Sequence, residues 1–553
     1  VTAHPVALHH PCEAPQAPRS QARRGPEELQ AFSFARRIEL VTLRPDIVLL
    51  VLDTQRIDRL SCYGCEEETS PYIDELASDA TIFNYAVAPA QWTVPSHASM
   101  FTGVYPSTHN TLQSFSLLPN TLPTLAERLR DGGYFTAAFC NNPLVGVVNN
   151  GLRRGFQSFL NYSGLMTSRP NQAGVRPSLY NRYRQTFKGA VTNFITGLQD
   201  AFARSDFLLD LSFTPLMAPL WQTALSFKGN TAKSLHDAAR FLIEREGVAQ
   251  DQPIFSFINV MGVHMPYHPA QRFTERFAPH VLHDKTAQRY LRHFNSDIFG
   301  WYAPLADSID EQDKITLDGM YNAEVATQDE HVGTFLKKLR ASGRLDNTLL
   351  IVCADHGEHL GEKRFIGHSL SLYNELVRVP LIIRDPGSDL ACGSSVDHFV
   401  STRRIFHTAL TAARLADETE EALTLAYSST SDPDRGTVYA EGTPPKNVVQ
   451  MLHRRRPQLT QELGCDQTRR AVWSDTHKLI QTGDDRLELF SAVQDFDEKA
   501  NLRDILPERV EALREYLQTF VSHAGVAVAP NEQADGYDDP EVLRRLRDLG
   551  YIE

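Results

Sequence analysis

Acidic and imidazole side chains follow two apolar runs of the sequence, at points where buried strands would end. Asp53 follows the run 46–52, and Asp355 and His356 follow the run 348–353. Two carboxylates and an imidazole form a ligand set that suits Mg²⁺, Mn²⁺, Ca²⁺ or Zn²⁺. A lone acid at a strand end is most often a cap or turn residue. The adjacency of Asp355 and His356 indicates a metal site instead.

A threonine hydroxyl stands where a helix is predicted to begin. Thr93 is followed two residues later by Pro95, which pre-forms a turn, and residues 96–101 can continue as a helix. The positive end of a helix dipole favours an anionic substrate and a developing alkoxide. A threonine hydroxyl is a weak nucleophile until a metal or a base lowers its pKa. Thr93 is therefore a simple helix cap if considered alone, and a candidate nucleophile beside a metal site.

The elements that must position these groups are strands that alternate with helices. Apolar runs without polar alternation predict strands buried on both faces of a parallel sheet. The alternation predicts an α/β fold, a doubly wound and mostly parallel sheet between helices, which binds ligands beyond the carboxyl ends of its strands. The predicted strands are 46–53, 135–139, 253–260, 348–353 and 379–384, and the predicted helices are 70–76, 121–129 and a long one through 317–339.

The chain of 553 residues is long enough for one large domain and a smaller one. We expect a flexible N-terminal extension over residues 1–44 and a catalytic α/β domain over 45–390. A smaller C-terminal subdomain should span 391–525, before a tail and helix over 526–553. Residues 165–235 combine aromatic and basic positions with an apolar stretch, which indicates a helical insertion. It could serve as a lid, as a dimer surface or, most simply, as extra packing.

Composition narrows the class of protein. A formal net charge of −13 argues against general nucleic-acid binding, which relies on Lys and Arg. No run approaches the roughly 18 apolar residues of a membrane span, and no apolar core of a signal peptide is visible. We therefore expect a cytoplasmic protein without a membrane span. The seven cysteines are irregularly spaced, so we expect no disulfide framework and a loop or core role for Cys62 and Cys65.

Five ordered motifs resemble the sulfatases of the alkaline phosphatase superfamily, together with their phosphonate- and phosphodiester-cleaving relatives. The resemblance runs from Pro45 to about Asn501 and implies that the C-terminal subdomain contains a small antiparallel sheet. The motifs are Asp53–Asp58 with Cys62–Gly64, Thr93–His97 with Phe101–His109, Asn259–Tyr267, Asp355–Glu358 with Gly367–Leu381, and Lys478–Asn501.

The resemblance implies an active site built around one divalent metal ion, and the sequence leaves open whether a second one binds. The implied metal ligands are Asp53, Thr93, Asp355 and His356. The groups implied to stabilise the transferred oxygens or to protonate the leaving group are His97, His264 and His368. The side chains implied to contact substrate or support its pocket are His109, Asn141 and Asn142.

Several positions depart from the family's pattern. Sulfatases of the common type carry cysteine or serine where Thr93 stands, and mature it to formylglycine. Threonine is not expected to undergo that oxidation, so no formylglycine is expected. His97 replaces an arginine, His368 replaces a substrate-contacting lysine, and Asn141 and Asn142 stand where a lysine and a histidine usually follow the strand. Three cationic groups that hold a sulfate are therefore neutral or titratable here.

These departures favour hydrolysis of phosphate or phosphonate esters, either monoesters or diesters, with Thr93 as the nucleophile. Relatives with an unmodified hydroxyl nucleophile usually cleave phosphate esters. The alternatives are a sulfuric ester hydrolase that works without formylglycine, a phosphoryl-group transferase, and a non-catalytic metal-binding module. The expected partner is a small anionic ester, and homo-oligomerisation stays open.

Overall fold

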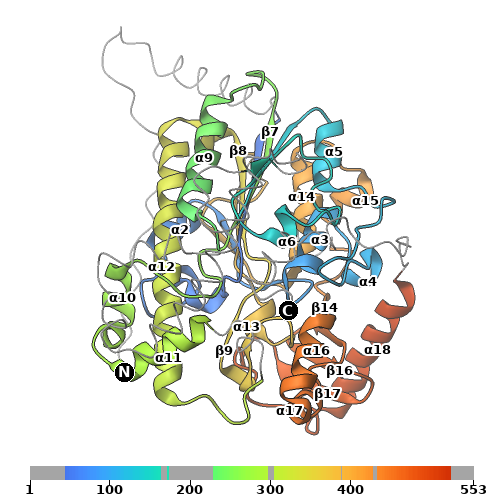
Figure 1. Cartoon of the computed structure of the whole chain (residues 1–553). Coiled ribbons are helices and arrows are strands. Elements are labelled where there is room, and N and C mark those ends of the chain that lie inside the picture. The colour runs from blue at the N-terminus through green and yellow to red at the C-terminus, as the bar shows by residue number, and fades with distance from the viewer. Residues whose placement is uncertain are drawn as a thin grey trace, which may run out of the picture. The chain divides into compact units, whose positions relative to one another are not determined.

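The structure of the chain, a computed structural model, is organised around a nine-stranded sheet with the order β12-β2-β11-β8-β1-β7-β4-β5-β6 (Figure 1). The strands are β1 (Asp46–Leu52), β2 (Thr81–Phe83), β4 (Phe135–Cys140), β5 (Ser158–Asn161), β6 (Asn171–Gln172), β7 (Ile254–Val260), β8 (Thr348–Cys353), β11 (Leu381–Arg384) and β12 (Ser394–Val396). The described residues are 44–163, 171–172, 228–296, 304–387, 389–426 and 432–524.

The strands in the middle of the sheet, from β8 to β5, run parallel to one another. Strand β11 is antiparallel to both of its neighbours, and β6 is antiparallel to β5. Every residue of β1, β7 and β8 is buried. Strands buried on both faces explain why these runs are continuously apolar in the sequence.

Helices cover both faces of the sheet (Figure 1). The helices that pack on it are α2 (Pro71–Ser78), α3 (Thr93–Thr102), α5 (Leu125–Asp131), α9 (Thr231–Glu244), α12 (Glu311–Ala341) and α14 (Ile405–Ala412). Leu50 of β1 packs in an apolar cluster with α2, α9 and α12. Its neighbour Leu49 points to the other face and packs with α3, α5 and α14. The predicted doubly wound α/β fold is confirmed.

The predicted elements differ from the observed ones mainly at their ends. The helix predicted over 121–129 begins at Leu125, because the Thr124 hydroxyl accepts from the Glu127 N–H and the Glu127 carboxylate accepts from the Thr124 N–H. The strand predicted over 379–384 begins at Leu381. Three predicted segments lie mostly or wholly outside the described residues. They are the insertion over 165–235, the extension over 1–44 and the tail over 526–553.

A second sheet of four antiparallel strands follows in the C-terminal part of the chain. Its strands are β14 (Val438–Gly442), β15 (Arg469–Ser474), β16 (His477–Thr482) and β17 (Arg486–Ser491), and α18 (Pro507–His523) packs on it. Residue 391, where we expected the C-terminal subdomain to begin, lies between β11 and β12, which both belong to the large sheet.

The helices of the described part of the chain include none that is long and apolar enough to cross a membrane. The described cysteines are free thiols. Cys62 lies in a short 3₁₀ turn, Ser61–Tyr63, and its backbone N–H donates to the Asp74 carboxylate.

A buried ion pair beside the small sheet anchors a segment that lies between β8 and β11 of the large one. Lys478 on β16 lies with its Nζ 2.7 Å from Glu498 Oε1, and both side chains are fully buried. The same Nζ donates to the Leu372 carbonyl and to Asn374 Oδ1. The Glu498 carboxylate also accepts from the Asn374 N–H. This pair therefore holds residues 372–374 against the C-terminal subdomain.

Removing the cation of this pair should destabilise the protein strongly. Lys478→Met leaves the Glu498 carboxylate buried without a counter-charge, which costs about 3–5 kcal/mol. Urea unfolding followed by tryptophan fluorescence measures the loss. The matched control is Lys499→Met, because its pair with Asp497 is 77% and 57% exposed and should contribute nothing measurable. Equal midpoints for the two variants would contradict the prediction.

Candidate functional site

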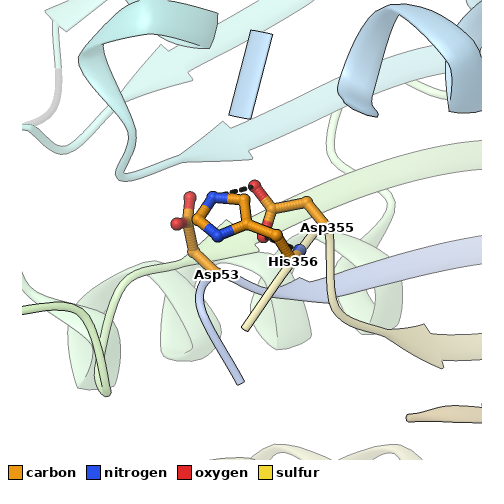
Figure 2. Close-up of side chains that lie close together, drawn as sticks. All are labelled: Asp53, Asp355 and His356. Atoms are coloured by element: carbon orange, nitrogen blue, oxygen red, sulfur yellow. Dashed lines mark hydrogen bonds and ion pairs between the residues drawn. The ribbon is translucent and has the colours of Figure 1, made fainter. Parts of the chain in front are cut away.

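Two strand ends bring the predicted metal ligands together. Strands β1 and β8 are neighbours, and their register sets Val51 opposite Cys353. Asp53 and Asp355 each lie two residues further on, so both carboxylates emerge at the same edge of the sheet. Ligand atoms of Asp53, Asp355 and His356 lie within 4.8 Å of one another, and all three residues are buried. Figure 2 shows the three side chains pointing toward one another from these two loops.

The start of α3 brings Thr93 to the same place. Thr93 is the first residue of this helix, whose ten residues are all buried, and Trp92 before it provides no side-chain cap. The Thr93 Oγ1 lies 3.3 Å from His356 Nε2. Uncapped N–H groups and the positive end of the helix dipole therefore face the metal-ligand group, an arrangement that favours anions.

Two asparagines bond to Asp53, and one of them also approaches the Thr93 hydroxyl. The registers of β1, β7 and β4 align Val51, Asn259 and Cys140 across the sheet. Asn142 therefore lies beyond the same edge, and its Nδ2 is 2.8 Å from Asp53 Oδ2 and 3.4 Å from Thr93 Oγ1. Asn259 Nδ2 donates to the same Asp53 oxygen at 3.1 Å, and its Oδ1 accepts from the Asn142 N–H.

The two carboxylates are poised for a cation. In the described part of the chain, Asp53 Oδ1 and Asp355 Oδ2 are buried and have no hydrogen-bond partner. Burial raises the pKa of both Asp53 and Asp355 to about 7, and for Asp53 the nearby charge of Asp355 contributes as well. A buried anion without a partner is costly, and a divalent cation would satisfy both oxygens at once. The donor set thus fits the divalent metal that the sequence predicts.

Three imidazoles form a row beside this group. The ring of His368 lies 4.6 Å from that of His356 and 5.2 Å from that of His264, measured between ring centroids. His356 Nδ1 bonds to the Gly357 carbonyl, and His264 Nδ1 bonds to the Met265 carbonyl. The structure therefore brings His264 and His368 next to the metal ligands. Their predicted catalytic roles stay predictions.

The other predicted residues take supporting positions. His97 lies one turn after Thr93, with its Nδ1 2.9 Å from the Thr93 carbonyl oxygen and 3.5 Å from Asp355 Oδ2. Its ring packs edge-on against Phe101 and Phe257 in the core. Burial there lowers the pKa of His97 to about 3. This packing favours a role in holding Thr93 and Asp355, and its predicted contact with substrate stays untested.

His109 and Asn141 also contact protein groups. His109 Nε2 bonds to Ser99 Oγ, and its Nδ1 accepts from the Thr111 N–H, so it links α3 to the segment that follows. Asn141 Nδ2 donates weakly to the Lys228 carbonyl at 3.4 Å. Whether either side chain contacts a substrate stays a prediction.

Three supporting residues were not among the predicted site residues. Asn259 bonds to Asp53, the Ser96 hydroxyl donates to the Asp355 carbonyl at 2.7 Å, and Glu358 bonds to His368. All three lie within motifs that carry the family resemblance. Their contacts depend on strand order and register, and local sequence patterns do not reveal those.

Fold and site together define an α/β protein with a candidate metal site at the carboxyl edge of its sheet. The model of the sulfatase family matches residues 45–415, and the chain belongs to this family. The predicted resemblance to sulfatases of the alkaline phosphatase superfamily is confirmed.

Known relatives are similar at low identity. The ulvan-active sulfatase of Formosa agariphila is 22% identical over 365 residues, which cover 65% of this chain and 60% of that protein. The multifunctional alkaline phosphatase superfamily protein PehA of Trinickia caryophylli is 22% identical over 398 residues, or 66% of this chain and 73% of that one. The crystal structure of the phosphonate monoester hydrolase of Agrobacterium radiobacter aligns with a TM-score of 0.59 at 19% identity, covering 87% of this chain and 96% of that chain.

Adding a divalent metal to protein stripped with EDTA should raise its unfolding temperature. An ion that binds only the folded state stabilises it by about 2.7 kcal/mol when present at 100 times its Kd. Asp355→Asn should remove most of this rise, because it removes a carboxylate that faces Asp53. Scanning calorimetry with Mn²⁺, Zn²⁺, Ca²⁺ and Mg²⁺ in turn measures the effect.

The matched control for this experiment is Glu441→Gln. Glu441 is a buried acid on β14 that accepts from the Ser107 N–H and is not one of the predicted site residues. This variant should keep the metal-induced rise. A rise that survives Asp355→Asn would place the ion elsewhere.

Proposed function

We propose that this protein is a metal-dependent hydrolase of phosphate or phosphonate esters that uses Thr93 as its nucleophile. The observation that carries the proposal is the position of the Thr93 hydroxyl. It begins a buried helix and lies 3.3 Å from His356 Nε2, beside two carboxylates with unsatisfied oxygens. A hydroxyl used only as a helix cap would accept from the helix N–H groups, whereas Thr93 is directed at the metal ligands.

The residues around Thr93 support an in-line attack of its hydroxyl oxygen on phosphorus. The Thr93 hydroxyl would give its proton to Nε2 of a neighbouring imidazole, His264 or His368, as its oxygen forms a bond to phosphorus. The ester oxygen would leave and take up that proton. Water would then cleave the phosphothreonine, regenerate the hydroxyl and release the acid. When bound, a divalent metal lowers the pKa of such a hydroxyl and neutralises developing charge. Asn142 orients Asp53 and Thr93 at once through its Nδ2.

The charge of the site favours singly charged substrates. Two aspartates and one divalent cation sum to zero. The positions where sulfatases place fixed cations here carry Asn141, His97 and His368. A phosphate monoester is largely a dianion at neutral pH, and holding it calls for several Lys or Arg groups. A phosphodiester or a phosphonate monoester carries one negative charge and suits this site better.

Hydrolysis of sulfate esters is the second candidate. A sulfate ester is also a monoanion, and the names of several relatives describe sulfatases, among them the ulvan-active sulfatase. A sulfated threonine would have to be released by water, because Thr93 cannot form the formylglycine hydrate that expels sulfate. We therefore rank this activity second.

A matched panel of esters with one aryl leaving group tests the proposal. It compares the phosphodiester, phosphonate monoester, phosphate monoester and sulfate on metal-loaded enzyme. The phosphodiester or phosphonate should have the highest kcat/KM. Thr93→Ala should lower kcat/KM by roughly 10³-fold or more, which is the usual effect of removing a covalent nucleophile.

Two controls accompany the panel. Thr93→Ser keeps a hydroxyl and should retain far more activity than Thr93→Ala. The metal-induced rise in unfolding temperature should survive in part in both variants, because Asp53, Asp355 and His356 remain. Fastest turnover of the sulfate would overturn the substrate assignment, and full activity in Thr93→Ala would overturn the nucleophile.

A further inference from the structure

A short hairpin brings two residues of the second metal loop face to face. Its strands are β9 (His359–Leu360) and β10 (Ile366–Gly367), which pair antiparallel with Gly367 opposite His359. One step further along this register, Glu358 stands opposite His368. Glu358 Oε1 lies 2.9 Å from His368 Nδ1, and both side chains are at most 1% exposed.

The backbone of Glu358 is fixed on both sides. Its N–H donates to the Glu375 carbonyl, and its carbonyl accepts from Arg56 Nη1 at 3.0 Å. Arg56 is itself held by Asp58 and Glu362, each 2.8 Å away. The backbone that carries the Glu358 carboxylate is therefore fixed in place. The neighbouring Gly357 could not be replaced by a larger residue unless the backbone moved. A Cβ on Gly357 would lie 2.0 Å from the Glu375 carbonyl oxygen.

A histidine in this position needs an orienting partner. The two ring nitrogens of an imidazole differ, and the hydrogen bond made by one decides what the other can do. A lysine, which sulfatases usually carry here, has a symmetric ammonium group and needs no such control. An ionised Glu358 carboxylate can only accept from Nδ1, and Nε2 then stands on the opposite edge of a ring that lies beside His356 and His264.

We propose that Glu358 is a positioning residue for ester cleavage. It holds His368 with the hydrogen on Nδ1, so that the lone pair of Nε2 faces the reacting groups and can take up the Thr93 proton for delivery to the leaving oxygen. The inference rests on the proposed function, because it assigns His368 to that reaction.

The geometry argues against the two other roles that Glu358 could have. Among the described residues, only Asp53, Asp355 and His356 bring their ligand atoms close enough together to hold a metal ion, so Glu358 completes no second metal site with the neighbouring histidines. Nor does Glu358 serve as the anion of a salt bridge with the neighbouring arginine. Arg56, which lies next to it, donates to the Glu358 carbonyl and pairs instead with Asp58 and Glu362.

A double-mutant cycle on the best ester of the panel tests the proposal. Glu358→Ala should lower kcat by about 10–100-fold with little change in KM, as is usual when an orienting partner is lost. Glu358→Gln keeps an oxygen that can accept from Nδ1 and should recover much of the loss. In a His368→Ala background, Glu358→Ala should cost less than about threefold, because residues that act as a unit are non-additive.

Losses that multiply in the double variant would overturn the proposal, since Glu358 would then act without His368. So would loss of the metal-induced rise in unfolding temperature in Glu358→Ala, which would show that Glu358 supports the metal loop instead. The matched control is again Glu441→Gln, a buried acid outside the site, which should leave kcat unchanged.

A second measurement does not depend on turnover. Long-range ¹⁵N spectra of histidine-labelled protein, with the His368 signals assigned by their absence in His368→Ala, should show the Nδ1–H tautomer in the wild type. In Glu358→Ala this tautomer should give way to Nε2–H. An unchanged tautomer refutes the positioning role. If no ester is cleaved but the tautomer shifts, the proposed function fails while the orientation of His368 by Glu358 stands.

Discussion

The close approach of two buried carboxylates is the constraint on which the rest of this structure depends. In the described part of the chain no Lys or Arg pairs with Asp53 or Asp355, and each has a buried oxygen without a hydrogen-bond partner. Repulsion would drive such groups apart on a mobile loop. Here they follow adjacent strands, β1 and β8, that are buried along their whole length, so separating them would require the sheet itself to open. The core thus supplies the rigidity that a divalent-metal site at this edge would require.

The same sheet sets the distances of the groups around the metal ligands. Asn259 and Asn142 belong to β7 and to the loop after β4, and the parallel registers place both at the level of Asp53. Their amide groups bond to one oxygen of Asp53 and leave the other for a cation. Asn142 also approaches Thr93, so the acid and the hydroxyl cannot move independently. A site assembled from several strand ends in this way is pre-organised before any ligand arrives.

Much of this arrangement could be predicted from the sequence, because hydrophobic runs mark buried strands and polar residues directly after them fall at one edge. Asp53, Asp355 and His356 were found in this way. Contacts that depend on the order of the strands in the sheet could not be predicted from hydrophobic runs. The bonds that Asn142 and Asn259 make to Asp53 were not predicted, and the expected contact of Asn142 with substrate stays a prediction. The predicted start of α5 was wrong for a local reason. The capping box at Thr124 fixes the first helical residue at Leu125, after the point where the apolar pattern begins.

The replacement of fixed cations by imidazoles changes what the surrounding protein must do. A lysine or arginine attracts an anion from many directions, so approximate placement is enough. An imidazole acts through one nitrogen in one direction, and it is useful only if the ring cannot turn. This explains why His264 and His368 are each tied at Nδ1, one to a backbone carbonyl and one to Glu358. It also explains why the loop that carries His264 is anchored, with Gln328 accepting from the Gly262 N–H. Under the proposed function, rigid orientation would do the work that the family resemblance assigns to fixed cations.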